Sequence, residues 1–291
     1  MNTLDALVAD IEQMPPLSEA ALRLLETFRN PDRTLEEMAK VIETDAGLAA
    51  NLLKLVNSPA MAPRMPINSI VRALSFLGDK ILLLTVLESA HPGLYTKPLA
   101  GYEGQKGELW RHSLHTAVAA RRLAELSYTS MEPGLAFTAA LLHDLGKVVI
   151  SKYLEGLTPE IAFGIELGHH TDFLEAEQTL LGTTHAEAGR LLAEHWRLPE
   201  PLPQVMGLHH TPSKAPPEHM PLTYVVHLAD AVAMWNGDAT SADAMQYLVD
   251  ENFESFIHIG SRDIDRLMLA TAAECEAIRV DLNGEATLAD E

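Results

Sequence analysis

The sequence is poor in cysteine, since Cys275 is the only one among 291 residues. A single thiol excludes a framework of disulfides within the chain and is typical of a reducing compartment. The N-terminus lacks the basic and apolar segments of an export signal. The longest apolar runs, such as residues 81–87, are shorter than a bilayer requires. We therefore expect a cytoplasmic protein with no membrane insertion.

Positive charge is also scarce, with 21 Lys and Arg residues against 41 Asp and Glu residues and a net charge of −20. Proteins bind nucleic-acid backbones mainly through Lys and Arg, so we expect no nucleic-acid partner. An acidic surface that keeps the protein in solution explains this charge. The short helices predicted within residues 34–58 resemble a helix-turn-helix, but residues 1–60 hold five basic and ten acidic residues. That is the wrong sign for DNA, so ordinary helix packing is favoured.

Alternating β-branched runs, which are typical of strands, are scarce as well. Apolar residues instead recur at helical spacing along almost the whole chain, which predicts an all-α fold. Ser18 is a predicted N-cap, and Thr34 with Glu37 forms a predicted capping box. The predicted helices cover residues 17–30, 34–44, 46–58, 68–78, 80–90, 109–127, 134–147, 158–168, 172–181, 184–196, 201–210, 220–236, 241–248 and 262–280.

A segment rich in Gly and Pro, residues 91–108, separates the predicted helices into two groups. We expect it to be a linker or a long loop. The remaining predicted parts are an N-terminal helical lobe (1–90), a helical bundle (109–280) and a frayed polar tail (281–291).

A histidine and an aspartate, His143 and Asp144, stand inside the apolar run LLHDLGKVVI. Two polar groups in a buried stretch need partners that replace their lost hydration. Similar residues recur along the second half of the chain, each on a different predicted helix or at its end. The whole series consists of His112, His143, Asp144, His185, His209, His210 and Asp230.

Imidazole nitrogen and carboxylate oxygen are preferred ligands of Fe, Mn, Co and Zn, and a helical bundle can point such groups inward from several helices. Neighbouring residues on a helix point about 100° apart. His143 and Asp144 therefore reach one cluster only near a helix end, or if the cluster is large. This arrangement suits an aspartate that bridges two ions, with a histidine ligand on one of them.

Each of these residues, taken alone, also has a structural explanation. His112 could be partly exposed, and His185 lies near a helix start. Asp144 could cap a helix, and Asp230 could be a buried carboxylate held by hydrogen bonds. It is the ordered series that favours a metal site.

Other polar residues carry weaker signals. His115 lies one turn from His112 and could support the ligands, although partial exposure is favoured. Glu175 and Glu177 could orient ligands through hydrogen bonds, with a solvated helix face as the alternative. For the histidine pair at residues 169–170, a solvated loop or helix end is favoured. No spacing argument applies to His195, His219, His227 and His258.

The motif HDLGK, with WRHS upstream and HLAD downstream, resembles the HD superfamily of metal-dependent phosphohydrolases. Over roughly residues 12–240, the chain resembles the HDOD-domain proteins more closely. The segments that carry this resemblance are MPPLSEAALRLLE, VIETDAGLAANLLKLVNSP, INSIVRALSFLG, HAEAGRLLAEHWRLP and VMGLHHTP. HDOD proteins are all-helical, are similar in fold to the HD-GYP phosphodiesterases and usually belong to bacterial signalling systems. The resemblance implies a helical N-terminal lobe packed with an HD-type bundle.

The resemblance also implies metal ligands at all seven residues of the His and Asp series, several of which many HDOD proteins lack. Two divalent transition metal ions, of Fe, Mn, Co or Zn, are expected. The family's lysine after the HD pair falls on Lys147, which would contact a phosphate or a metal-bound anion. HD-GYP enzymes carry a Gly-Tyr-Pro element after the paired histidines, where this chain reads HHTPSKAPPEH. This departure argues against hydrolysis of cyclic dinucleotides.

Two functions follow from these observations. The first is a regulatory module, such as a response regulator, that acts on a signalling protein partner. Its metal would be a structural cross-link or a sensor of redox state or oxygen, with iron among the candidates. The second is a metal-dependent phosphohydrolase that acts on a nucleotide or another small phosphoester, with Asp144 and Lys147 as its catalytic residues. The resemblance to HDOD proteins favours regulation, whereas the complete ligand series favours hydrolysis.

Overall fold

The computed structural model describes residues 3–58, 61, 63, 65–239 and 247–283. Within these residues every regular element is a helix, and β structure is limited to two isolated bridges, Leu99 with Gly104 and Ser127 with Ile257. The predicted all-α fold is confirmed. Most of the predicted helix 241–248 lies outside the described residues. Residues 284–291 of the predicted tail lie outside them as well.

The chain divides into two compact units that do not follow its order. One unit contains the residues up to Pro15 together with Gly93–Thr271. The other contains Pro16–Pro92 and the residues from Ala272 onward. The last helix, α14 (Ser261–Asn283), therefore contributes to both units.

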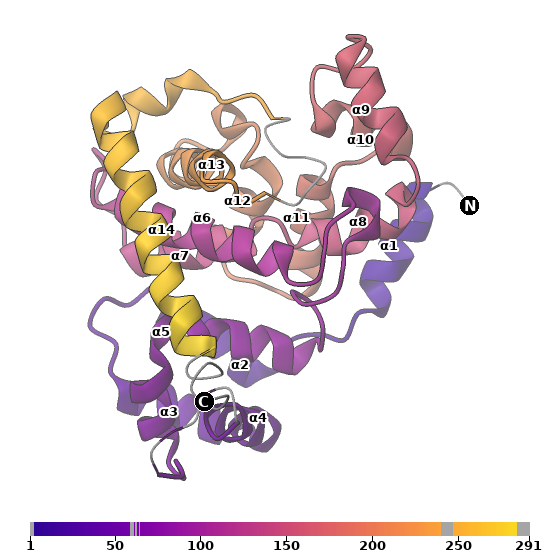
Figure 1. Cartoon of the computed structure of the whole chain (residues 1–291). Helices are drawn as coiled ribbons and strands as arrows, with labels where there is room; N and C mark the ends of the chain where they lie inside the picture. The colour runs from indigo at the N-terminus through magenta and orange to yellow at the C-terminus, as the bar shows by residue number, and fades with distance from the viewer. Residues whose placement is uncertain (1–2, 59–60, 62, 64, 240–246, 284–291) are drawn as a thin grey trace, which may run out of the picture. The chain divides into compact units, whose positions relative to one another are not determined.

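The smaller unit consists mainly of α2 (Glu19–Thr27), α3 (Leu35–Glu43), α4 (Ala46–Val56) and α5 (Ile70–Ala90) (Figure 1). The predicted caps are present: Ser18 caps α2, and Thr34 forms a capping box with Glu37 at the start of α3. The two helices predicted within residues 68–90 lie end to end as α5, which is broken at Gly78 by a positive φ of 68°.

The larger unit holds the other helices, and Figure 1 labels those of the α type. They are α1 (Thr3–Gln13), η1 (Ala100–Tyr102), α6 (Glu108–Ala124), α7 (Pro133–Leu142), α8 (Gly146–Leu154), α9 (Thr158–Glu166), α10 (Phe173–Leu181), α11 (His185–His195), α12 (Leu202–Leu208), η2 (Pro212–Lys214), α13 (Met220–Trp235) and η4 (Glu251–Ser255). The N-terminal helix α1 was not predicted, and it packs against α8 and α11.

The core of the larger unit is centred on α13, which buries every residue from Leu222 to Met234. A helix that is apolar on all sides belongs in an interior. It packs against α6 and α7, while α11 packs against α8 and α12. These packed helices carry the residues of the predicted metal site.

The predicted helix 134–147 is wrong in one respect, because the chain forms two helices there. Helix α7 ends at Leu142 and α8 begins at Gly146, with His143 and Asp144 in the turn between them. The stretch Pro133–Leu154, which joins α7 and α8, is long and apolar enough to cross a membrane. However, 83% of its most apolar part is buried inside the protein. The core helix of a folded domain has the same composition, so this stretch is a weak indication of a membrane span.

Most of the segment 91–108, predicted as a linker or long loop, belongs to the larger unit, which it enters at Gly93. The tyrosines of this segment, Tyr95 and Tyr102, are 0% exposed. The backbone N–H of Gly101 donates to Ser151 on α8, and Thr158 at the start of α9 donates to the carbonyl of Gly101. This segment is therefore part of the scaffold around the site.

Candidate metal centre

The turn between α7 and α8 places His143 and Asp144 at the same point in the interior. Both residues are 0% exposed. The sequence predicted that these two neighbouring side chains could reach one cluster only near a helix end or if the cluster was large. They lie at a helix end, and both reach one centre. The Nδ1 of His143 lies 2.6 Å from the carbonyl oxygen of Ala140, which directs Nε2 toward the centre.

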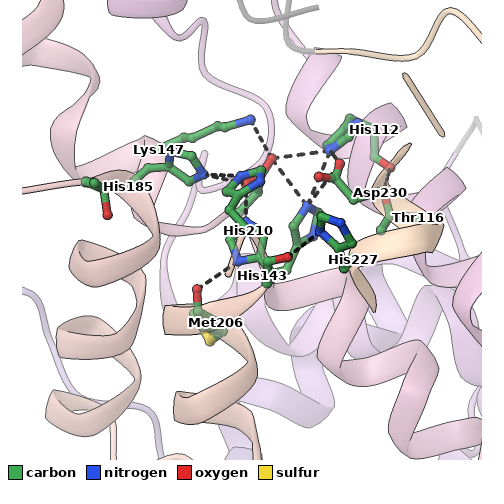
Figure 2. Close-up of polar contacts among 12 residues, drawn as sticks. His112, Thr116, His143, Lys147, His185, Met206, His210, His227 and Asp230 are labelled. Atoms are coloured by element: carbon green, nitrogen blue, oxygen red, sulfur yellow. Dashed lines mark hydrogen bonds and ion pairs between the residues drawn. The ribbon is translucent and has the colours of Figure 1, made fainter. Parts of the chain in front are cut away.

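The carboxylate of Asp144 lies between two sets of histidines. On one side, its Oδ2 is 3.3 Å from His112 Nε2 and 3.4 Å from His143 Nε2. On the other side, its Oδ1 is 3.5 Å from His185 Nε2 and 3.6 Å from His209 Nε2. Figure 2 shows the rings of His112, His143 and His185 directed toward one another from separate segments of the chain. A single carboxylate thus faces both sets.

The remaining two residues of the predicted series complete these sets. Asp230 Oδ1 lies 3.0 Å from His112 Nε2 and 3.7 Å from His143 Nε2. His210 Nε2 lies 3.0 Å from His185 Nε2. The structure therefore brings together all seven predicted residues. Two overlapping groups have ligand atoms close enough to hold an ion, and they are His112, His143 and Asp144, and Asp144, His185, His209 and His210.

The histidine rings are held in a common orientation by acceptors behind them. The Nδ1 of His112 lies 2.7 Å from the carbonyl oxygen of Asp238, and that of His209 lies 2.8 Å from the carbonyl oxygen of Met206. A histidine that donates its Nδ1–H in this way keeps the lone pair of Nε2 available to a metal ion. The orientation is therefore that of a ligand set.

His185 is oriented by a carboxylate instead of a carbonyl. Its Nδ1 lies 2.8 Å from Glu177 Oε2, and its backbone N–H donates to the same oxygen at 2.7 Å. Glu177 is 0% exposed. Of the two glutamates considered from the sequence, Glu177 thus supports a ligand, whereas Glu175 accepts hydrogen bonds from Thr171 at the surface.

The electrostatics of the centre fit a bound cation. Burial opposes charge on Asp144, but His143 and Lys147 hold its pKa well below the usual range. Burial likewise opposes charge on His112, yet contacts with Asp144 and Asp230 raise its pKa to about 10. Burial, reinforced by the adjacent imidazoles, lowers the pKa of His209 to about 4. His209 is thus neutral beside an ionised carboxylate, the forms in which both groups bind a metal, whereas His112 would release a proton on binding an ion.

The hydrogen bonding of the centre supports the same fit. The Oδ1 of Asp144 and the Nε2 of His209 are buried without a hydrogen-bond partner among the described residues, whereas the Oδ2 of Asp144 is paired with Lys147. Such groups are costly in an interior unless an ion or another partner satisfies them. Imidazole nitrogen and carboxylate oxygen are suitable donors for divalent Fe, Mn, Co or Zn. The residues present therefore fit a divalent transition metal.

Lys147 contributes a buried positive charge to the centre. Its Nζ lies 2.7 Å from Asp144 Oδ2, and the side chain is 3% exposed. The ammonium also lies 5.5 Å from the ring centroids of Tyr102 and Tyr247. Lys147 lies near the start of α8, three residues after Asp144. Residues three apart on a helical turn lie on the same side, so the HDLGK motif brings the ammonium to the carboxylate.

One supporting residue of the centre was missed by the sequence reasoning. The Nδ1 of His227 lies 2.7 Å from the carbonyl oxygen of His209, and its Nε2 accepts the backbone N–H of Asp250. It lies one turn before Asp230 on α13, and that spacing is the signal that could have identified it.

The other histidines have partners outside the two ligand groups. His115 is paired with Asp238 at 2.9 Å, and His195 lies 2.8 Å from the carbonyl oxygen of Met14. Tyr128 lies within hydrogen-bond distance of His258, at 3.2 Å. The structure places none of these three among the groups of potential ligands formed by the described residues.

The chain resembles several known proteins. An uncharacterized protein of Treponema pallidum (strain Nichols) is 31% identical over 229 residues, which are 78% of this chain and 44% of that protein. This chain thus spans less than half the length of that relative.

Three solved structures share the fold. An HDOD domain protein of Geobacter sulfurreducens has a TM-score of 0.60 at 24% identity, covering 96% of this chain and 95% of that one. A candidate signal transduction protein of Marinobacter aquaeolei VT8 has a TM-score of 0.72 at 20% identity, covering 96% and 64%. A candidate phosphohydrolase of Shewanella amazonensis SB2B has a TM-score of 0.59 at 23% identity, covering 96% and 97%.

The family follows from the sequence match. Residues 14–212, more than half of the chain, match the HDOD domain. This match includes α2 to α5 and the ligand candidates from His112 to His210, and it leaves out α1 and Asp230. The chain therefore belongs to the HDOD domain family.

Proposed function

We propose that this chain is a regulatory HDOD module of signal transduction that is built around a two-metal centre and acts on a protein partner. The burial of the ligand groups carries this proposal. His143, Asp144, His185 and His209 are 0% exposed, and His112 and Asp230 are 1% and 3% exposed. A catalytic site needs room for its substrate and an open coordination position. Among the seven candidate ligands, His210 alone is partly exposed. A site that is enclosed to this degree suits a metal that holds helices together or responds to redox state.

The two groups of ligands suggest how the ions are shared. One ion would be held by His112, His143 and Asp230, and the other by His185, His209 and His210. Asp144 faces both groups and would bridge the two ions. Fe, Mn, Co and Zn all suit this donor set. Because the ligands come from five segments of the larger unit, the bound ions would cross-link the bundle.

In this proposal the module acts in the cytoplasm, in keeping with its single cysteine, and its overall charge favours a protein partner over nucleic acid. A net charge of −20 disfavours binding to nucleic acid. The similar protein of M. aquaeolei is described as a candidate signal transduction protein, which is consistent with a signalling partner.

The alternative is a metal-dependent phosphohydrolase that acts on a small phosphoester. The similar protein of S. amazonensis is described as a candidate phosphohydrolase. The observation in its favour is the complete ligand set, with Lys147 2.7 Å from the shared carboxylate. Two bound ions would supply Lewis acidity that activates water and binds a phosphoryl oxygen. Lys147 would neutralise negative charge that develops on the substrate.

Metal analysis combined with a hydrolysis assay tests the proposal. We expect about two transition metal ions per chain in the purified protein. With the site fully loaded, hydrolysis of bis-p-nitrophenyl phosphate and of a panel of nucleotides should stay at the rate of the free metal ion. Turnover that disappears on Asp144→Asn would overturn the regulatory proposal and establish the alternative. Purified protein that binds no metal, even after incubation with Fe, Mn, Co and Zn, would contradict both.

A further inference from the structure

We propose that Tyr102 is a positioning residue of the metal centre, which acts through Glu177 on the ligand His185. This inference rests on the proposed metal centre. It concerns a residue from the segment 91–108, which carries no predicted ligand. Tyr102 is 0% exposed and lies within hydrogen-bond distance of a buried carboxylate.

The backbone around Tyr102 is fixed to the scaffold at several points. Leu99 and Gly104 form an isolated β-bridge on either side of it. Gly101 donates to Ser151 and accepts from Thr158. A Cβ at Gly101 would lie 2.0 Å from the carbonyl oxygen of Ser151, so only glycine allows this close approach. The tyrosine ring is therefore held in one place relative to α8.

The hydroxyl of Tyr102 completes the hydrogen bonding of Glu177. It donates to Glu177 Oε1 at 2.5 Å, while the backbone N–H of His185 donates to Oε2. The Nδ1 of His185 lies 2.9 Å from Oε1 and 2.8 Å from Oε2. Donors on both oxygens prevent the carboxylate from rotating about its own axis. Tyr102 thus helps to hold the group that sets the ring orientation and tautomer of His185.

The ring of Tyr102 makes a second contact with the centre. Its centroid lies 5.5 Å from the ammonium of Lys147, a distance at which a cation is attracted to an aromatic face. The ring also stacks on Phe173, with 5.4 Å between the two ring centroids. Tyr102 therefore contacts both the carboxylate that orients His185 and the lysine that neutralises Asp144. Substitution by phenylalanine retains the ring and removes only the hydroxyl.

The test measures Co²⁺ binding to the full chain and its Tyr102→Phe variant, by competition with a chelator and by visible absorption. We expect Tyr102→Phe to weaken Co²⁺ binding about threefold to tenfold, the effect of one net hydrogen bond, and to change the Co²⁺ spectrum. Glu177→Gln should weaken it about 10- to 100-fold. If Tyr102 acts through Glu177, the double variant should bind Co²⁺ as the Glu177→Gln variant does.

Tyr95→Phe is the matched control. Tyr95 is also 0% exposed, and its hydroxyl donates to the carbonyl of Leu141 instead of to a group that contacts a ligand. This variant should lose some thermal stability and keep the wild-type Co²⁺ affinity and spectrum. Wild-type Co²⁺ affinity and spectrum in Tyr102→Phe would overturn the inference, as would additive effects in the double variant. Wild-type protein that binds no Co²⁺ would instead overturn the proposed metal centre, and this inference with it.

Discussion

Asp144→Asn is expected to abolish binding of both metal ions, because one carboxylate faces both groups of histidines. An amide cannot supply the negative charge or bridge two cations through two equivalent oxygens. In the wild type, metal at 1,000 times its dissociation constant should stabilise the fold by about 4 kcal/mol. The Asp144→Asn variant should show no such stabilisation. Metal content and thermal unfolding with and without metal measure both effects.

The metal-free form of Asp144→Asn should also be less stable than the metal-free wild type. The variant removes the carboxylate charge that lies 2.7 Å from the buried ammonium of Lys147. Breaking a buried pair in this way costs about 3–5 kcal/mol. Asp45→Asn is the control, because that carboxylate caps α4 in the smaller unit, which contains none of the candidate ligands. Full metal content in Asp144→Asn would show that each group holds its ion without the shared carboxylate.

Gly146→Ala is expected to be the most disruptive conservative substitution in the HDLGK motif. A Cβ at residue 146 would lie 1.8 Å from the carbonyl oxygen of His185 and 2.5 Å from the backbone nitrogen of Gly189. Backbone atoms cannot move aside as a flexible side chain can, so α8 and α11 would have to separate. We expect a loss of at least about 3 kcal/mol in the free energy of unfolding. Denaturant unfolding measures this loss.

The same separation should weaken metal binding, because α8 follows directly on Asp144 and α11 begins at His185. Gly189→Ala provides a control from the other side of the same helix crossing. Its Cβ would lie 3.4 Å from the nitrogen of Gly146 and 3.6 Å from Met206 Cε, which are ordinary contacts. Alanine at a helical position is also favoured by up to about 1 kcal/mol over glycine. Equal destabilisation by the two variants would contradict the proposed role of this close approach.

Much of the fold could be predicted because helix formation depends on neighbours in the sequence. Apolar spacing predicted most helices, and the caps at Ser18 and Thr34 form hydrogen bonds with residues only three positions away. The same reasoning failed at residues 143–145. There the apolar pattern continues, but the backbone turns to place two polar side chains at one centre. It also missed α1, which packs against helices far along the chain.

The sequence by itself determined the helical class, the family and the seven candidate ligands, because helical spacing and the HDLGK motif are local. Only the tertiary structure decided that these ligands converge around Asp144 and that Glu177, not Glu175, supports His185. It alone showed the contacts that Tyr102, Gly146 and His227 make around the centre. The physical reason is that each of these contacts joins segments separated along the chain, and helix packing sets their distances. Amino-acid spacing describes one helix at a time, whereas a metal centre depends on where several helices cross.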